Sequence, residues 1–203
     1  MTYSAEDFWT WFKANNKAYL FLDEVDEEVR EELMSSFLTE LHKYCANLYF
    51  QISGNANEAP EIVITADGDI EYFDKVEELL SKSPGIKEWK FTAFKQPIAG
   101  HFNIVWEGIE VSTENMWFIP LFSAEAAELG LRICLRGHED LSDDDTLLNA
   151  MYVMLDTILG EKNFALNIGY VEIQPYTEEA EDEAYPILEL PGYLDEHTRT
   201  IKN

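Results

Sequence analysis

Four strand-like runs follow one another between residues 102 and 136, and they constrain the fold of this chain more than any other feature. Turn-like stretches with Gly108, Ser112-Thr113 and Gly130 separate them. Strands that cluster in runs, and do not alternate strictly with helices, favour an α+β fold with a mostly antiparallel or mixed sheet over a doubly wound one. The runs are Phe102 to Trp106, Ile109 to Val111, Trp117 to Phe122 and Leu129 to Leu135. Pro120, in the third run, favours an edge strand or a bulge.

Apolar residues at three- and four-residue spacing predict two long helices and two shorter ones. The clearest runs from Val25 to Cys45, with acidic residues at its start and Lys43 near its end, as the helix dipole favours. The second follows Ser142 and ends at Gly160, a typical residue just past a helix end. The shorter helices are expected in residues 4–21, with an aromatic face, and from Ile70 to Leu80.

The remaining segments complete a single predicted domain over residues 1–203. A hairpin is expected from Leu48–Ile52 and Glu61–Ala66, a further strand from Trp89 to Phe94, and a long final strand from Phe164 to Ile173. Residues 175–203 are expected to be an irregular, acidic, Pro-containing segment that docks on the core through Ile187, Leu188, Leu190 and Tyr193. No internal repeat or interdomain linker is visible.

Charge limits the classes of partner. Forty Asp and Glu residues stand against fourteen Lys and Arg residues, a formal net charge of −26. Such a chain repels nucleic-acid phosphates and anionic membrane surfaces, because binding to both depends on Lys and Arg. It favours cations and basic proteins, whose encounter rate a negative field raises. The plainer interpretations are a solvated acidic surface or adaptation to a salty habitat.

Compartment and redox state follow from simpler features. The first residues have neither the basic nor the apolar region of a signal peptide, and the longest apolar runs are far too short to span a bilayer. Cys45 and Cys134 lie far apart and in no metal-ligand spacing. We expect both cysteines to be free thiols, because the sequence gives no support for a disulfide. Free thiols are typical of a reducing compartment, so we expect a cytoplasmic protein.

Catalytic signatures are absent from the sequence, so no cofactor, metal or catalytic residue is predicted. It contains no Gly-x-Ser-x-Gly elbow and no glycine-rich phosphate loop. Asp67-Gly68-Asp69 resembles the start of a calcium loop, but Tyr72 stands where that loop needs Gly, and capping of the next helix is the better explanation. His138-Glu139-Asp140 could supply a general base, although a solvated loop explains it more simply.

Two sets of charged residues are candidate binding sites. The first is acidic and would engage a basic partner: Glu178, Glu179, Glu181, Asp182 and Glu183, together with the carboxylates from Glu139 to Asp145. The second belongs to the alternative hypothesis, an enzyme or small-molecule binder, and consists of Arg132, Arg136 and His138. Arg132, Cys134 and Arg136 share one strand face and could receive an anion, but pairing with the chain's own acids is the simpler expectation.

Several stretches together resemble a family of uncharacterised bacterial acidic α+β proteins of similar length. They are Phe8–Phe12 with Asn15-Asn16, Leu48–Phe50, Glu61–Gly68, Trp89–Pro97, Leu155–Glu161 with Phe164-Ala165, and Leu188–Pro191. The resemblance implies the same fold class and carries no activity, cofactor or site residue. In size, charge and gross architecture the chain is also similar to the small acidic immunity proteins of bacterial toxin systems. The net charge of −26 together with the absence of catalytic motifs makes a non-enzymatic protein-interaction module the expected function, and a role like that of those immunity proteins is one form of it.

Overall fold

The computed structural model combines α-helices with three small sheets, so the predicted α+β class is confirmed. It describes residues 3–53, 59–123, 128–137, 145–180 and 182–201. The two long helices are present as α2 (Glu27–Tyr44) and α4 (Asp145–Leu159). The contacts gather into two compact units, Met1–Lys95 and Gln96–Asn203. No helix of the described part of the chain is both long and apolar enough to cross a membrane.

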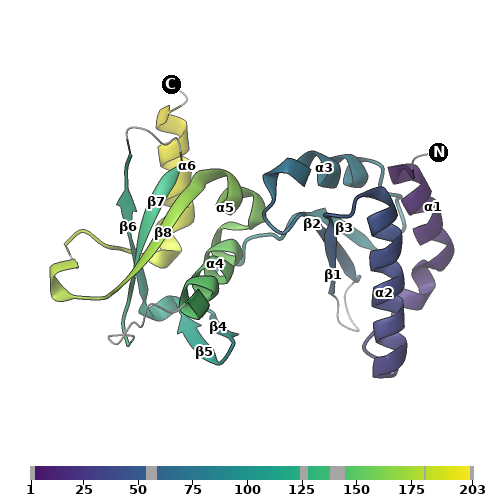
Figure 1. The fold of residues 1–203 in the computed structure, drawn as a ribbon, viewed down its shortest axis with the longest axis horizontal. Helices are drawn as coiled ribbons and strands as arrows, with labels where there is room; N and C mark the ends of the chain where they lie inside the picture. The colour runs from purple at the N-terminus through teal and green to yellow at the C-terminus, as the bar shows by residue number, and fades with distance from the viewer. Residues whose placement is uncertain (1–2, 54–58, 124–127, 138–144, 181, 202–203) are drawn as a thin grey trace. The chain divides into compact units, whose positions relative to one another are not determined.

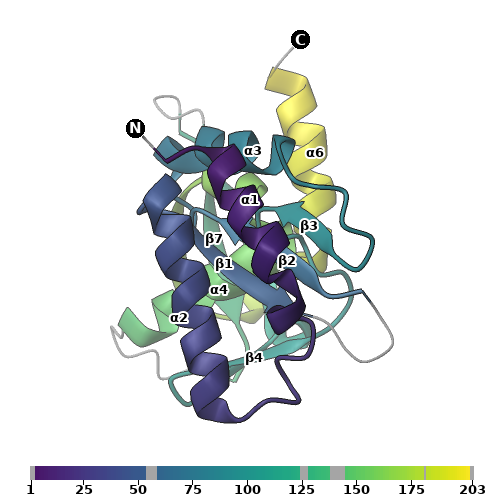
Figure 2. The same ribbon diagram turned by 90° about the vertical axis from the view of Figure 1, so that its right-hand side faces the viewer.

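The first unit is a three-stranded sheet with two helices on one face (Figures 1 and 2). Its elements are α1 (Ala5–Asn15), α2, β1 (Tyr49–Ser53), β2 (Glu61–Thr65), α3 (Phe73–Ser81) and β3 (Lys90–Ala93), with 3-10 turns at Asn16–Tyr19 and Ile70–Tyr72. β1 and β2 form the predicted antiparallel hairpin. β3 pairs in parallel with β2, and α3 supplies the crossover that a parallel pair needs.

Aromatic side chains form the core of the first unit. The sequence spacing predicts a face of Phe8, Trp11 and Phe12 on α1; Phe8 and Phe12 are buried and Trp11 is half-buried, and all three rings meet the fully buried Phe37 of α2. Trp9 is buried as well. β2 is the central strand, and its residues from Ile62 to Thr65 are all buried. This accounts for its unbroken apolar sequence, since a strand that is covered on both faces shows no alternation.

The second unit contains a four-stranded mixed sheet, a separate hairpin and three helices. Its elements are β4 (Asn103–Trp106), β5 (Ile109–Ser112), β6 (Met116–Leu121), β7 (Leu129–Leu135), α4, α5 (Glu161–Asn167), β8 (Ile168–Pro175), β9 (Tyr185–Pro186) and α6 (Leu190–Ile201). The sheet order is β8-β7-β6-β9, with β8 parallel to β7 and the other pairs antiparallel. β4 and β5 pair only with each other among the described strands.

The core of the second unit lies on one face of this sheet. Leu131 and Ile133 of β7 point into it and pack with Met154 of α4 and with Leu190 of α6, all fully buried. The strand alternates, so Arg132 and Cys134 point to the opposite face. There a smaller cluster joins Cys134 to Ile119 and Ala180, with Trp117 and Tyr176 packed against it.

The predicted strand from Phe164 to Ile173 is wrong in its first part. Residues Glu161–Asn167 form helix α5, and the strand begins at Ile168. Gly160 has φ 75° and ψ 150°, a conformation that ends α4 and redirects the chain into a second helix. Phe164 packs on the core from this short helix, so its apolar character does not distinguish helix from strand.

The C-terminal segment docks on the core as predicted, but it is not irregular throughout. Ile187 and Leu190 are fully buried, with Leu188 and Tyr193 packed against the same cluster. From Leu190, however, the chain is the helix α6. Pro191 is compatible with a helix at this point, because the first-turn N–H groups have no partner within the helix.

Pro120 lies where the sequence places it, at a sheet edge. β6 pairs with β9 only at Trp117 and Phe118, so the described part of the sheet ends at β6 beyond Phe118. The β6–β7 register runs through Pro120 without a shift. Its nitrogen, which carries no hydrogen, therefore belongs on the open side.

Candidate functional site

The predicted acidic partner-binding segment lies on the surface where the structure describes it. Glu178 begins a 3-10 turn and is exposed, and Asp182 and Glu183 are exposed in the turn that follows. Glu179 lies in the same 3-10 turn, whereas Glu181 is outside the described residues. Of the second predicted acidic stretch, Asp145 is the exposed first residue of α4, and residues 138–144 are also outside the described part.

Basic side chains of the first unit are largely engaged by its own acids. The ion pairs are Lys43–Glu40, Lys75–Glu78, Lys82–Glu6, Lys90–Glu61 and Lys95–Asp67. Each pair neutralises one positive charge, and acidic residues remain in excess. The surface field of this unit therefore stays negative.

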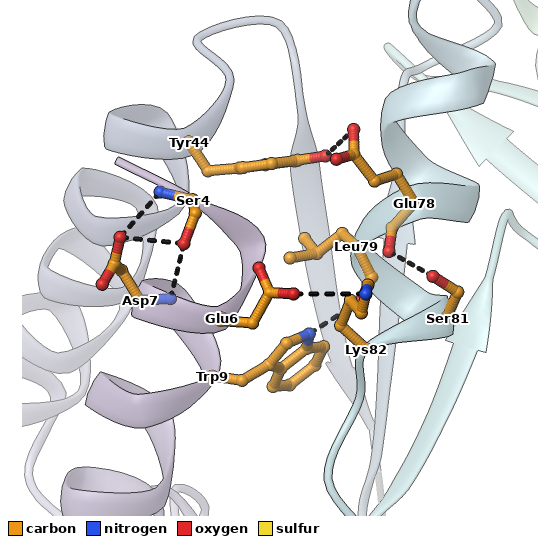
Figure 3. Close-up of polar contacts among 9 residues, drawn as sticks. All are labelled: Ser4, Glu6, Asp7, Trp9, Tyr44, Glu78, Leu79, Ser81 and Lys82. Atoms are coloured by element: carbon orange, nitrogen blue, oxygen red, sulfur yellow. Dashed lines mark hydrogen bonds and ion pairs between the residues drawn. The ribbon is translucent and has the colours of Figure 1, made fainter. Parts of the chain in front are cut away.

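One of these ion pairs, Lys82–Glu6, belongs to a polar cluster that joins α1, α2 and α3 (Figure 3). The indole Nε1 of Trp9 donates to the Leu79 carbonyl oxygen at 2.7 Å, and the Tyr44 hydroxyl donates to Glu78 Oε2 at 2.9 Å. Lys75 also donates to Glu78, and this bond holds the pKa of the Glu78 carboxyl below its ordinary value. Burial, reinforced by the bond to Glu78, raises the pKa of the Tyr44 hydroxyl.

This polar cluster has the chemistry of a structural clamp. Every carboxylate drawn in Figure 3 accepts from a neighbour, including Asp7, which forms a reciprocal capping box with Ser4 at the start of α1. Each shifted pKa keeps a group in its usual charge state near neutral pH. A general acid or base needs the opposite, a pKa moved toward the working pH.

The Arg132, Cys134 and Arg136 face is used internally. Arg132 forms an ion pair with Glu172 of β8, and this bond lowers the pKa of the Glu172 carboxyl. Gln174 donates to Cys134 Sγ at 3.2 Å, and burial raises the pKa of this thiol. A thiol held in its protonated form is a poor nucleophile. Both Cys45 and Cys134 are free cysteines.

Arg136 takes a different partner from the acid that the sequence suggests. Its guanidinium carbon lies 4.6 Å from the ring centroids of both Trp117 and Tyr176, which are 4.2 Å apart. This cation–π arrangement fixes the exposed arginine over the edge of the small cluster. His138, the third residue of the alternative ligand site, lies outside the described residues.

The Asp67–Asp69 segment caps a helix, as the sequence indicates. The Asp69 carboxylate accepts from the Glu71 backbone N–H at 3.1 Å, and Asp67 pairs with Lys95 at 2.8 Å. Asp67 and Gly68 both have positive φ, which makes the tight turn after β2. Within the described residues, no group of three or more His, Cys, Asp and Glu side chains could hold a metal ion.

A groove along α6 was not foreseen from the sequence. It encloses about 400 Å³ and is lined by Tyr185, Leu188, Glu189, Gly192, Tyr193 and Glu196. Four of these residues recur at helical spacing, from Glu189 to Glu196. That spacing is visible in the sequence. Pro186 and Pro191, however, favour an irregular segment, and for this reason no helix is predicted here from the sequence.

A second groove, beside the β4–β5 hairpin, differs in chemistry. It encloses about 350 Å³, and its lining includes Asn103, Glu110, Ser112 and Glu114. Asn103 donates to Glu110 at 3.2 Å, and neither glutamate forms an ion pair within the described residues. None of the described residues that line this groove is aromatic.

The chain matches no protein-family model, no curated protein and no solved structure. Its function is therefore inferred from its own charge and geometry.

Proposed function

We propose that this protein is a non-enzymatic interaction module whose acidic surface binds a basic partner protein. The observation that carries the proposal is that most of the basic side chains with described contacts are already engaged within the protein. In the described structure the lysines of five ion pairs and Arg132 are neutralised by the chain's own acids, and Arg136 is held over two aromatic rings. Exposed carboxylates such as Glu178, Asp182 and Glu183 face solvent, and they form the kind of surface that a cationic partner would contact.

The second unit carries most of the imbalance. Residues 96–203 contain 21 Asp and Glu against 5 Lys and Arg, a formal net charge of −16, whereas residues 1–95 contain 19 against 9, a net charge of −10. A field of this sign raises the encounter rate with basic proteins and disfavours acidic ones. The acidic partner-binding segment, Glu178 to Glu183, belongs to the more negative unit.

The partner is proposed to be a protein, in a cytoplasmic setting. A basic toxin that this chain neutralises is one form of the proposal, which the similarity in size and charge to immunity proteins supports. Nucleic acid and anionic membranes are disfavoured as partners by the same charge.

A direct test measures binding of a fluorescent hexa-arginine peptide and of its neutral hexa-citrulline counterpart by anisotropy, in low and high salt. We expect the arginine peptide to bind at low salt, to dissociate as salt screens the charges, and the citrulline peptide not to bind. Co-purification from the source cells at low salt then identifies the natural partner. Failure to bind any basic probe at low salt, with the chain folded, would remove the proposal. A chain that folds only in concentrated salt would instead attribute the charge to habitat.

A further inference from the structure

The α6 groove combines aromatic walls with carboxylates, whereas the described lining of the hairpin groove has carboxylates without aromatic rings. Tyr185 comes from β9, and Tyr193 comes from α6. Their ring centroids lie 5.6 Å apart at an interplanar angle of 46°, and both residues line the groove. Two aromatic rings thus line one concave space.

Both tyrosine rings are held in place by the core. Each lies 5.5 Å from the ring of Phe118, which is fully buried in β6. Tyr185 is also fixed by strand pairing, since it stands opposite Phe118 in the β6–β9 register. The walls are therefore ordered before any ligand arrives, which lowers the entropic cost of binding.

The charge of the groove is negative. Glu189, the last residue of the 3-10 turn before α6, and Glu196 of α6 are both exposed, and they line the groove together with Tyr193. The acidic partner-binding segment precedes Tyr185 directly in the chain. A cation that reaches the groove meets carboxylates at close range and a favourable field at long range.

Gly192 keeps the groove open. It lies between the two glutamates in the chain, and a Cβ built at this position would meet no atom within 4 Å. Its φ is not in the left-handed region, so larger residues fit the backbone at this position without strain. A longer side chain there would occupy the groove itself.

We propose that this groove binds the guanidinium group of an arginine side chain from the basic partner. The inference rests on the proposed function and deepens it, because it names the surface and the side chain that is recognised. The planar guanidinium stacks on tyrosine faces and donates charge-assisted hydrogen bonds to carboxylates, and both kinds of partner line this one groove. The hairpin groove with Glu110 and Glu114 has carboxylates without rings, and so serves as the control surface.

The test compares variants in the hexa-arginine anisotropy assay at low salt. Gly192→Leu fills the groove without changing charge, and Tyr185→Leu removes one π face; each is expected to weaken binding about tenfold. Glu189→Gln with Glu196→Gln should weaken it by a similar factor. The matched double change, Glu110→Gln with Glu114→Gln, removes the same charge from the hairpin groove and should alter binding less than about twofold. Circular dichroism checks that each variant is folded.

The outcomes separate the two proposals. If native protein binds the peptide but Gly192→Leu binds equally well, the groove is not the site and the general acidic surface remains the explanation. Equal losses of peptide affinity from the two double glutamate changes would likewise rule out the groove as the binding site, since the loss of charge alone would then explain the weaker binding. If the folded native protein binds no basic peptide at all, the proposed function itself fails.

Discussion

At the scale of single residues, Phe37 connects the helices of the first unit to its sheet. It is fully buried, and its ring contacts those of five other aromatic residues, Phe8, Trp11, Phe12, Tyr19 and Phe50. These partners come from α1, the 3-10 turn after it and β1. Deleting this ring leaves a cavity that no single neighbour can fill.

Phe37→Ala should therefore lower the free energy of unfolding by about 3–5 kcal/mol, as large-to-small changes of buried aromatic residues do. Urea denaturation followed by tryptophan fluorescence measures the change. The control is Phe21→Ala, because Phe21 is 60% exposed and its loss should matter by less than about 0.5 kcal/mol. Similar effects from both variants would contradict the assigned core.

The pKa of Glu172 makes a prediction about pH. Arg132 holds this pKa below the ordinary glutamate value of 4.5, so the pair stabilises the folded state above that value. The contribution is lost as the pH falls through the lowered, folded-state pKa. Glu172→Gln should thus destabilise the protein at neutral pH, by up to about 1 kcal/mol because both side chains are partly exposed. At a pH below the folded-state pKa the difference should vanish. Glu114→Gln, which removes an acid that forms no ion pair within the described residues, is the matched control at each pH.

At the scale of elements, most helices and strands could be predicted because their apolar residues repeat with one clear period. The run from Val25 to Cys45 gives α2, and the four runs after residue 102 give β4 to β7. The errors arise where two signals conflict. Glu161–Asn167 carries too few apolar residues to reveal its period, and Pro191 reads as a helix breaker although it lies in a first turn, where proline is tolerated.

Two glycines should respond in opposite directions to alanine. Gly160 adopts φ 75° and ψ 150°, a region that other residues enter at a cost of about 1–3 kcal/mol, so Gly160→Ala should destabilise the junction of α4 and α5. Gly192 lies within α6 in open space, so Gly192→Ala should stabilise the protein by about 0.5–1 kcal/mol. Thermal unfolding of both variants measures the pair. A loss of stability at Gly192 would show that its side of the helix is not open.

At the scale of the whole molecule, the sequence establishes the surplus of acidic residues but not its arrangement. The pairing of Arg132 with Glu172 depends on β7 lying beside β8, which no local pattern encodes. The α6 groove depends on Tyr185 reaching Phe118 through the β6–β9 register. Such long-range pairings decide which carboxylates are neutralised and which face a partner. The acidic segment could therefore be predicted, and the groove could not.

The single-domain prediction concerns cooperativity between the two compact units. If residues 1–203 unfold as one domain, Phe37→Ala should lower the hydrogen-exchange protection of β7 amides as much as that of β2 amides. Native-state exchange measured by mass spectrometry separates the two strands. Protection of β7 that stays unchanged, while that of β2 falls, would mean that the units unfold independently.

Pro120 has a consequence for the protein at high concentration. An open strand edge is a template on which a second molecule can add its own strand, the first step of aggregation. Phe118 is the last β6 residue that pairs with β9 in the described sheet, and two positions later this edge carries the Pro120 nitrogen, which has no hydrogen to donate. A strand from a second molecule cannot continue its hydrogen bonds to β6 past Pro120. We therefore expect this edge, together with repulsion between the negative surfaces, to oppose aggregation.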